Sequence, residues 1–259
     1  MELTLQILLI VGLMGFVGAF VDSSFGMGYG MLAPFLIILG FDPLLVVPVL
    51  LLAQMIAGFT GTVFHTLYKN VKIDMEKKVN LKVTAIFTLS GMLGMFIAVW
   101  IAVNLPDFIM MLYIGIMVVI VGIIMFKKIK LQFSWNKLYL ISGFAAFNKA
   151  FSGGGYGPIA TTGQIVTGRG HKQAIAVSNF SEAFLSGFGF LMYFILNGFS
   201  DLLLFFQMII IMGISSIIAP PLGALLLKNI KKEKANMVIG TVSVVLGLIT
   251  IIRTAIILI

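Results

Sequence analysis

Three ionisable residues lie inside long apolar stretches of the sequence, namely Asp22, Lys149 and Glu182. Charged side chains are costly inside a membrane segment, so each of them is a candidate for function. Lys149 could contact an anionic ligand. The alternative is an ion pair between Lys149 and Asp22, because buried charges are normally paired.

Glu182 lies at the end of a polar run, residues 178–182, within an otherwise apolar stretch. Burial opposes the charged form of a carboxyl group, so we expect Glu182 to take up and release a proton. Asp22 and Asn179 complete the group of residues expected to handle a coupling proton or ion. The alternative for Glu182 is a structural hydrogen bond to a neighbouring helix.

Two glycine-rich stretches, residues 24–30 and 152–158, interrupt the apolar sequence. A glycine inside a helix costs about 1 kcal/mol relative to alanine, but it lets the backbone leave the helix and approach a ligand closely. Helix starts attract anions, so we predict an anion site at these breaks. The expected binding residues are Ser23, Ser24, Gly26, Gly28, Tyr29, Lys149, Ser152, Gly153, Gly154, Gly155 and Tyr156, with Thr161 and Thr162 as further donors. The alternative is a crossing point of helices without a ligand.

Several kinds of chemistry have no support in the sequence. The chain has no cysteine, and we interpret His65 and His171 as interfacial and loop residues, because no second ligand lies at metal-binding spacing. The glycine runs lack the Lys-Ser/Thr ending of a nucleotide-binding loop, and no nucleophile–base pair is evident. We therefore expect no enzyme activity, no metal and no cofactor.

The composition predicts an all-α integral membrane protein. Sixty per cent of the residues are hydrophobic and only 10% are charged, far from the balance of a soluble domain. The first apolar run has no basic region before it, which favours a retained span over a cleaved signal peptide. About ten membrane segments are expected, at 3–22, 31–40, 43–68, 83–104, 107–126, 136–151, 159–167, 173–197, 202–227 and 235–258, with breaks at 23–30 and 152–158.

The distribution of charge along the chain predicts its orientation. The formal net charge is +8, and 15 of the 17 Lys and Arg residues lie in or at the edge of the loops after the third, fifth, seventh and ninth segments. Basic loops of membrane proteins face the cytoplasm, so we expect both termini outside and no binding of nucleic acid.

The two halves of the chain resemble each other. Gly28 and Gly155 are 127 residues apart, as are Asp22 and Lys149, and the glycine pair 115 and 122 returns as 240 and 247. Residues 1–130 and 131–259 would each hold five segments, so the second repeat would enter the membrane inverted. Inverted repeats with paired broken helices are typical of secondary transporters, with the site at the breaks and alternating access between the two sides. The alternative is that small residues merely let helices pack closely.

The glycine motifs also resemble a known family, the TauE/SafE sulfite and organosulfonate exporters. The similarity rests on residues 21–30 and 152–158, on Phe64-His65 before the loop at 69–71, and on residues 179–184, and it covers essentially the whole chain. Two positions depart from the family pattern. Lys149 stands where related sequences tend to carry Asp or Asn, and Gln54 stands where related first repeats often carry Glu.

The resemblance implies export of a small sulfur-containing anion, such as sulfite or an organosulfonate, across the plasma (inner) membrane. Its expected partners are the anion, the lipid bilayer and a coupling proton. The alternatives are an anion channel or a carrier of another small anion, such as a carboxylate. A membrane-embedded enzyme or assembly factor is a third hypothesis.

Overall fold

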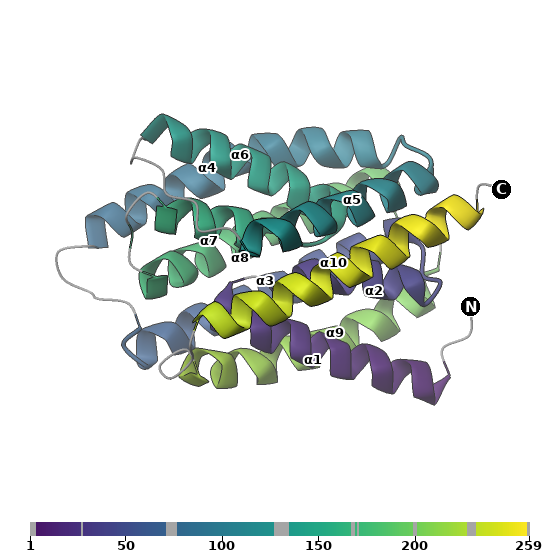
Figure 1. Cartoon of the computed structure of the whole chain (residues 1–259), viewed down its shortest axis with the longest axis horizontal. Coiled ribbons are helices and arrows are strands. Elements are labelled where there is room, and N and C mark those ends of the chain that lie inside the picture. The colour runs from purple at the N-terminus through teal and green to yellow at the C-terminus, as the bar shows by residue number, and fades with distance from the viewer. Residues whose placement is uncertain are drawn as a thin grey trace.

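The computed structural model describes residues 4–26, 28–70, 77–126, 135–166, 169, 171–198, 201–226 and 232–257. These residues form ten α-helices and one short 3-10 helix, with no strand among them, so the all-helical prediction is confirmed (Figure 1). In chain order the elements are α1 (Leu5–Phe25), η1 (Tyr29–Met31), α2 (Leu32–Ile38), α3 (Pro43–Leu67), α4 (Lys77–Ala102), α5 (Asp107–Phe126), α6 (Trp135–Ser152), α7 (Tyr156–Val166), α8 (His171–Asn197), α9 (Leu202–Leu226) and α10 (Lys232–Ile257).

Acidic and hydroxyl side chains mark several helix starts, as N-capping requires. The Asp42 carboxylate accepts the Leu44 amide at 2.6 Å, with Pro43 as the first helical residue of α3. The Asp201 carboxylate accepts the Leu204 amide at 3.0 Å at the start of α9. These polar turns separate apolar runs, which explains why the predicted segments and the observed helices agree closely.

Seven helices are long and apolar enough to cross a membrane: α1, α3, α4, α5, α8, α9 and α10. The protein is therefore a multi-pass membrane protein. The other three predicted segments are also helices, but α2 and α7 have only 7 and 11 residues, and α6 carries Lys137 and Lys149 within 18 residues. Figure 1 shows the two ends of the chain at the same end of the bundle.

The long helices pack in pairs. Helix α1 lies against α9, α4 against α6, α3 against both α8 and α9, and α5 against α10. A β-carbon on Gly115 would lie 3.1 Å from the Gly247 carbonyl oxygen, and one on Gly122 would lie 2.8 Å from that of Gly240. These contacts run in opposite order along α5 and α10, so the two helices are antiparallel. The small residues let their backbones approach closely.

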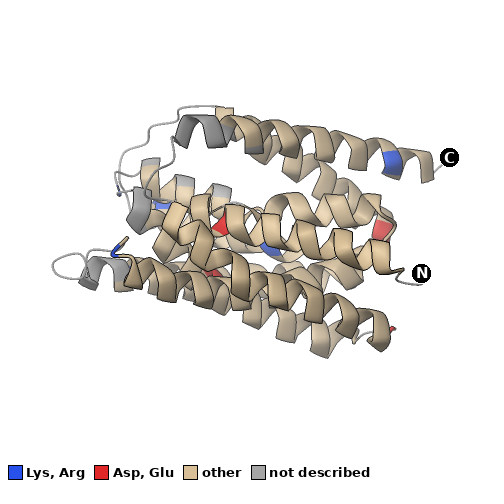
Figure 2. Ribbon diagram, turned by 90° about the horizontal axis from the view of Figure 1, so that it is seen from below, with Lys and Arg blue, Asp and Glu red and all other residues tan. Residues whose placement is uncertain are grey.

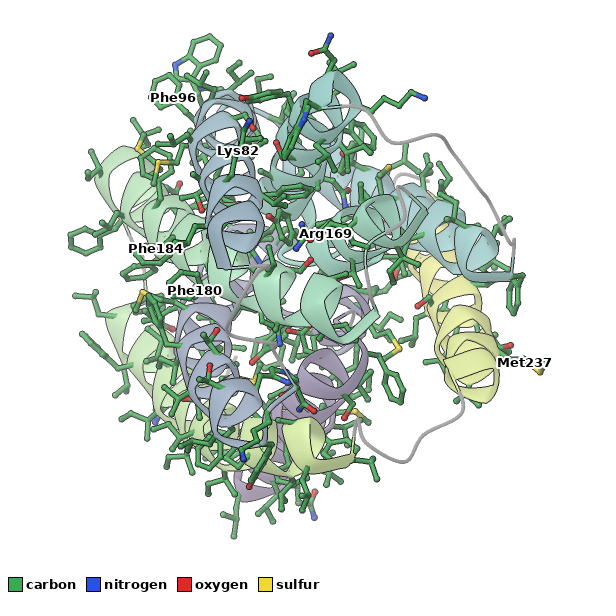
Figure 3. The ribbon with its side chains drawn as sticks, turned by 90° about the vertical axis from the view of Figure 1, so that its left-hand side faces the viewer. Lys82, Phe96, Arg169, Phe180, Phe184 and Met237 are labelled. Carbon is green, nitrogen blue, oxygen red and sulfur yellow. The ribbon has the colours of Figure 1, made fainter. Side chains whose placement is uncertain are left out.

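The outer surface of the bundle is apolar. Figure 3, viewed along the bundle, shows the side chains of Phe96, Phe184 and Met237 directed outward, and all three are exposed. In water such a surface would be unfavourable, whereas lipid tails provide the apolar surroundings that these side chains require. Polar residues are therefore informative where they are buried, and many of them gather around the two glycine-rich stretches.

Candidate functional site

The first break begins where α1 ends at Phe25. Gly26 has a φ of +74°, a left-handed conformation that favours glycine, and its amide donates to the Asp22 carbonyl oxygen at 2.5 Å. The Gly28 amide donates to the Asp22 carboxylate at 2.9 Å. Two amides predicted to face a ligand are therefore held by Asp22 in this structure. A β-carbon on Gly28 would lie 1.9 Å from the Gly18 carbonyl oxygen, so this position requires glycine.

The second break has the same start. Helix α6 ends at Ser152, Gly153 has a φ of +65°, and its amide donates to the Lys149 carbonyl oxygen at 2.8 Å. The Gly153 carbonyl oxygen accepts the Gln54 side-chain amide of α3 at 2.6 Å. The Ser152 hydroxyl lies 2.7 Å from the Gly154 carbonyl oxygen, so it too is engaged by the backbone. Both predicted breaks are narrower than expected, because the helices continue through Phe25 and Ser152.

The two breaks touch each other through their backbones. A β-carbon on Gly154 would lie 2.6 Å from the Gly30 Cα, and one on Gly30 would lie 3.2 Å from the Gly155 nitrogen. Only glycine at these positions allows so close an approach. The contact brings residues from both halves of the chain to one buried place.

The hydroxyl groups of Ser23 and Ser24 attach α1 to α9. Ser23 donates to the Pro220 carbonyl oxygen at 2.8 Å, and Ser24 lies 2.7 Å from the Phe20 carbonyl oxygen and 3.2 Å from that of Gly223. Both serines are buried. In this structure they therefore act in helix packing beside the first break.

The buried charges form one group. Lys149 Nζ lies 2.6 Å from Glu182 Oε1, and the two side chains are 0% and 4% exposed. The ion pair that the structure gives Lys149 is thus with Glu182, and not the Asp22 pair considered from the sequence. Asp22 is also buried and interacts electrostatically with both residues. Figure 2 shows a few charged positions in the middle of an otherwise uncharged bundle.

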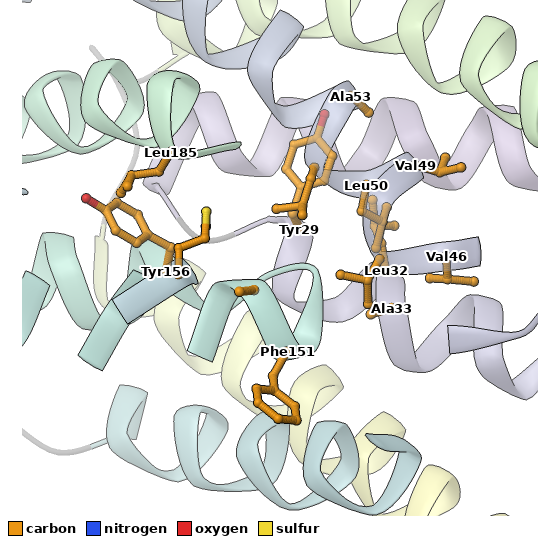
Figure 4. Packing of buried hydrophobic residues seen from close by; sticks show 14 of the residues in the cluster. Tyr29, Leu32, Ala33, Val46, Val49, Leu50, Ala53, Phe151, Tyr156 and Leu185 are labelled. Atoms are coloured by element: carbon orange, nitrogen blue, oxygen red, sulfur yellow. The ribbon is translucent and has the colours of Figure 1, made fainter. Parts of the chain in front are cut away.

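The tyrosines that follow the breaks are both buried and hydrogen-bonded. The Tyr29 hydroxyl lies 2.8 Å from Ser216 Oγ of α9, and the Tyr156 hydroxyl lies 3.0 Å from Ser181 Oγ of α8. Figure 4 shows the rings of Tyr29, Tyr156 and Phe151 within the apolar cluster, each directed away from the other two. The two tyrosines therefore anchor the breaks to different long helices.

Thr161 of α7 lies beside the first break. Its Oγ1 would be 2.8 Å from a β-carbon on Gly26, and it has no hydrogen-bond partner among the described residues. The Thr162 side chain lies outside the described residues. Thr161 thus places a hydroxyl from the second half of the chain against the backbone of the first half.

Asn179 and His65 belong to a polar chain between α3, α8 and α9. Asn179 Nδ2 lies 3.4 Å from His65 Nε2, and His65 Nδ1 lies 3.1 Å from Asn70 Nδ2, which also donates to the Ala224 carbonyl oxygen at 2.9 Å. His65 is fully buried between helices, although it lies in the last turn of α3 beside the basic loop. The end of α9 covers the end of α3, which a sequence pattern does not reveal. The side chain of His171 lies outside the described residues.

Two buried polar residues beside the second break were missed as site residues, Gln54 and Asn148. Each has a side-chain atom without a partner among the described residues, Oε1 in Gln54 and Nδ2 in Asn148. The repeat could have indicated Gln54, which precedes Glu182 by 128 residues, whereas nothing in the spacing indicates Asn148. In the described part of the chain no three His, Cys, Asp or Glu side chains are placed to hold a metal ion.

Comparison with known proteins identifies one family. The family model described as "Sulfite exporter TauE/SafE" matches residues 11–250, which is most of the chain. No curated protein and no solved structure matches this chain.

Proposed function

Because the chain belongs to the TauE/SafE family of sulfite exporters, which are membrane transporters and not enzymes, we propose that it exports a small sulfur-containing anion. Sulfite or an organosulfonate is the expected substrate. The site lies where the two glycine breaks meet, and the carrier works by alternating access.

The observation that carries this proposal is the backbone contact between Gly30 and Gly154, one turn beyond Lys149 in the second repeat. Broken helices that meet between repeats are where transporters hold their substrates, because helix starts and uncovered backbone groups are available there. Lys149 supplies a buried cation beside the contact. A small anion is the ligand that such a cation and helix start would attract.

The charges around Lys149 support coupling to protons. Asp22, Lys149 and Glu182 together carry one net negative charge when all three are ionised. Glu182 Oε1 forms an ion pair with Lys149 Nζ at 2.6 Å. An anion would be repelled from that arrangement. Uptake of a proton by Glu182 removes one negative charge and frees Lys149 for the substrate, since a neutral carboxyl group no longer forms an ion pair. One proton would then move with each cycle of binding and release.

The helix packing supports two inverted repeats, at 1–130 and 131–259. The repeat pairs each of α1 to α5 with the helix five positions later, α6 to α10. When the members of each pair are exchanged, the α1–α9 contact becomes α6–α4 and the α3–α9 contact becomes α8–α4. The α3–α8 and α5–α10 pairs exchange with themselves. All six of these contacts occur in the structure, as a two-fold relation between the halves requires.

The test is flux through the purified full-length protein in liposomes. Labelled sulfite uptake should accelerate when the vesicles are loaded with unlabelled sulfite on the far side, because a loaded carrier returns faster. Uptake that is not accelerated would favour the anion channel instead. If sulfite, thiosulfate, sulfoacetate, sulfate and carboxylates all fail to cross, the proposed transport is wrong.

A further inference from the structure

Asn148 is a buried residue of α6 whose side-chain donor is not used by the described part of the protein. Its exposed fraction is 1%, and Nδ2 has no hydrogen-bond partner there. Buried amide donors are nearly always paired in folded proteins, so an unpaired one requires an explanation. A ligand that accepts a hydrogen bond would provide it.

The orientation of this amide is set by a neighbouring helix. The Tyr113 hydroxyl of α5 donates to Asn148 Oδ1 at 3.3 Å. The Tyr113 ring also packs on that of Phe151, at 4.7 Å between the centroids. With the oxygen engaged by Tyr113, the Nδ2 group is left to face the other side.

That side is the start of α7. A β-carbon on Gly155, the residue before Tyr156, would lie 2.4 Å from Asn148 Nδ2 and 3.7 Å from Ser152 Oγ. Glycine at 155 is therefore what lets the unpaired amide lie directly against the backbone at the start of α7. Helix α7 has 11 residues, and in its first turn the Tyr156 and Gly157 amides have no partner within the helix, while Pro158 has no amide hydrogen.

We propose that Asn148 is a substrate-binding residue, which donates its amide to an oxygen of the anion at the start of α7. This inference rests on the proposed function and adds a specificity-determining contact to the same site. The amide distinguishes substrates that present an oxygen acceptor from halide ions, since its hydrogen-bond geometry is directional. Tyr113 is a positioning residue that acts through Asn148.

The proposal predicts the effect of removing the donor. In purified full-length protein, Asn148→Leu keeps the size of the side chain and should weaken binding of sulfite about 10- to 100-fold, the range for one hydrogen bond to a charged group. Binding of chloride should change much less. Thr88→Val is the matched control, because Thr88 Oγ1 is also buried without a partner among the described residues, but on α4.

Tyr113→Phe keeps the test decisive if Asn148→Leu fails to fold. On its own it should weaken sulfite binding about 3- to 10-fold, and where Asn148→Leu folds it should have no further effect in that variant. A purely structural role for Tyr113 would instead add to the Asn148→Leu effect. Unchanged sulfite affinity in both single variants overturns this inference alone. Failure of the wild type to bind or transport any of the anions overturns the proposed function itself.

Discussion

Asp22 and Lys149 occupy equivalent places at the ends of their helices. The Asp22 carbonyl oxygen accepts the Gly26 amide at 2.5 Å, and the Lys149 carbonyl oxygen accepts the Gly153 amide at 2.8 Å, with a left-handed glycine in both cases. The backbone is thus repeated while the side-chain charge is reversed. In the proposed site, an acid at the first break and a base at the second would make the two breaks inequivalent, since the lysine lies at the second break.

The role of Glu182 in proton coupling can be tested by replacing its carboxyl group with an amide. Glu182→Gln removes the ionisable group but keeps the size of the side chain, so transport should no longer follow an imposed pH gradient. The measurement is sulfite flux in liposomes with and without the gradient. Asp201→Asn is a matched control, since Asp201 is an exposed cap of α9 and Asn also caps helices well. Flux by Glu182→Gln that still responds to the gradient would remove the coupling role.

Lys149 has a predicted role in both stability and binding, and two variants separate them. Lys149→Met leaves Glu182 buried without its cation and should destabilise the protein by about 3–5 kcal/mol. The double variant Lys149→Met/Glu182→Gln removes both members of the ion pair and leaves Asp22 with the Gly28 amide, so its thermal stability should recover. Sulfite binding should be lost in both variants. Binding in the double variant at wild-type affinity would mean that the lysine is a structural residue only.

The sequence was sufficient for the helices because their apolar runs are long and their ends carry glycine, proline or aspartate. The Asp42-Pro43 turn and the left-handed Gly26 are examples of such local signals. The place of the breaks was also predictable, since glycine is costly inside a helix. The residues at which the breaks begin were not predictable, because a left-handed glycine after each helix allows Phe25 and Ser152 to remain helical.

Contacts between distant helices could not be predicted in the same way. The sequence leaves Lys149 either to bind substrate or to pair with Asp22, yet it lies against Glu182 because α8 packs against α3, α4 and α7. His65 is buried because α9 covers the end of α3, and Asn70 reaches the Ala224 carbonyl oxygen. These outcomes depend on helix packing, which hydrophobic periodicity alone does not specify.

Gly28 should be one of the least tolerant positions. In Gly28→Ala the new β-carbon would lie 1.9 Å from the Gly18 carbonyl oxygen and 2.4 Å from the Asp22 nitrogen, and backbone atoms cannot move aside as a side chain can. Overpacking commonly costs about 1–3 kcal/mol, and a backbone clash should reach at least the upper end. The yield of monodisperse protein in detergent measures the effect. Gly143→Ala is the control, because its nearest neighbour, the Ser90 carbonyl oxygen, is 3.9 Å away.

The absence of cysteine allows a clean test of membrane orientation. Asn104 lies in the exposed turn before α5, and Lys69 is exposed just after α3. If the basic loops face the cytoplasm, Asn104→Cys should react with a membrane-impermeant maleimide in intact cells. Lys69→Cys should react only after the cells are opened, and the unmodified chain should not react at all. Labelling of Lys69→Cys from outside, with Asn104→Cys protected, would invert the proposed orientation and place both termini in the cytoplasm.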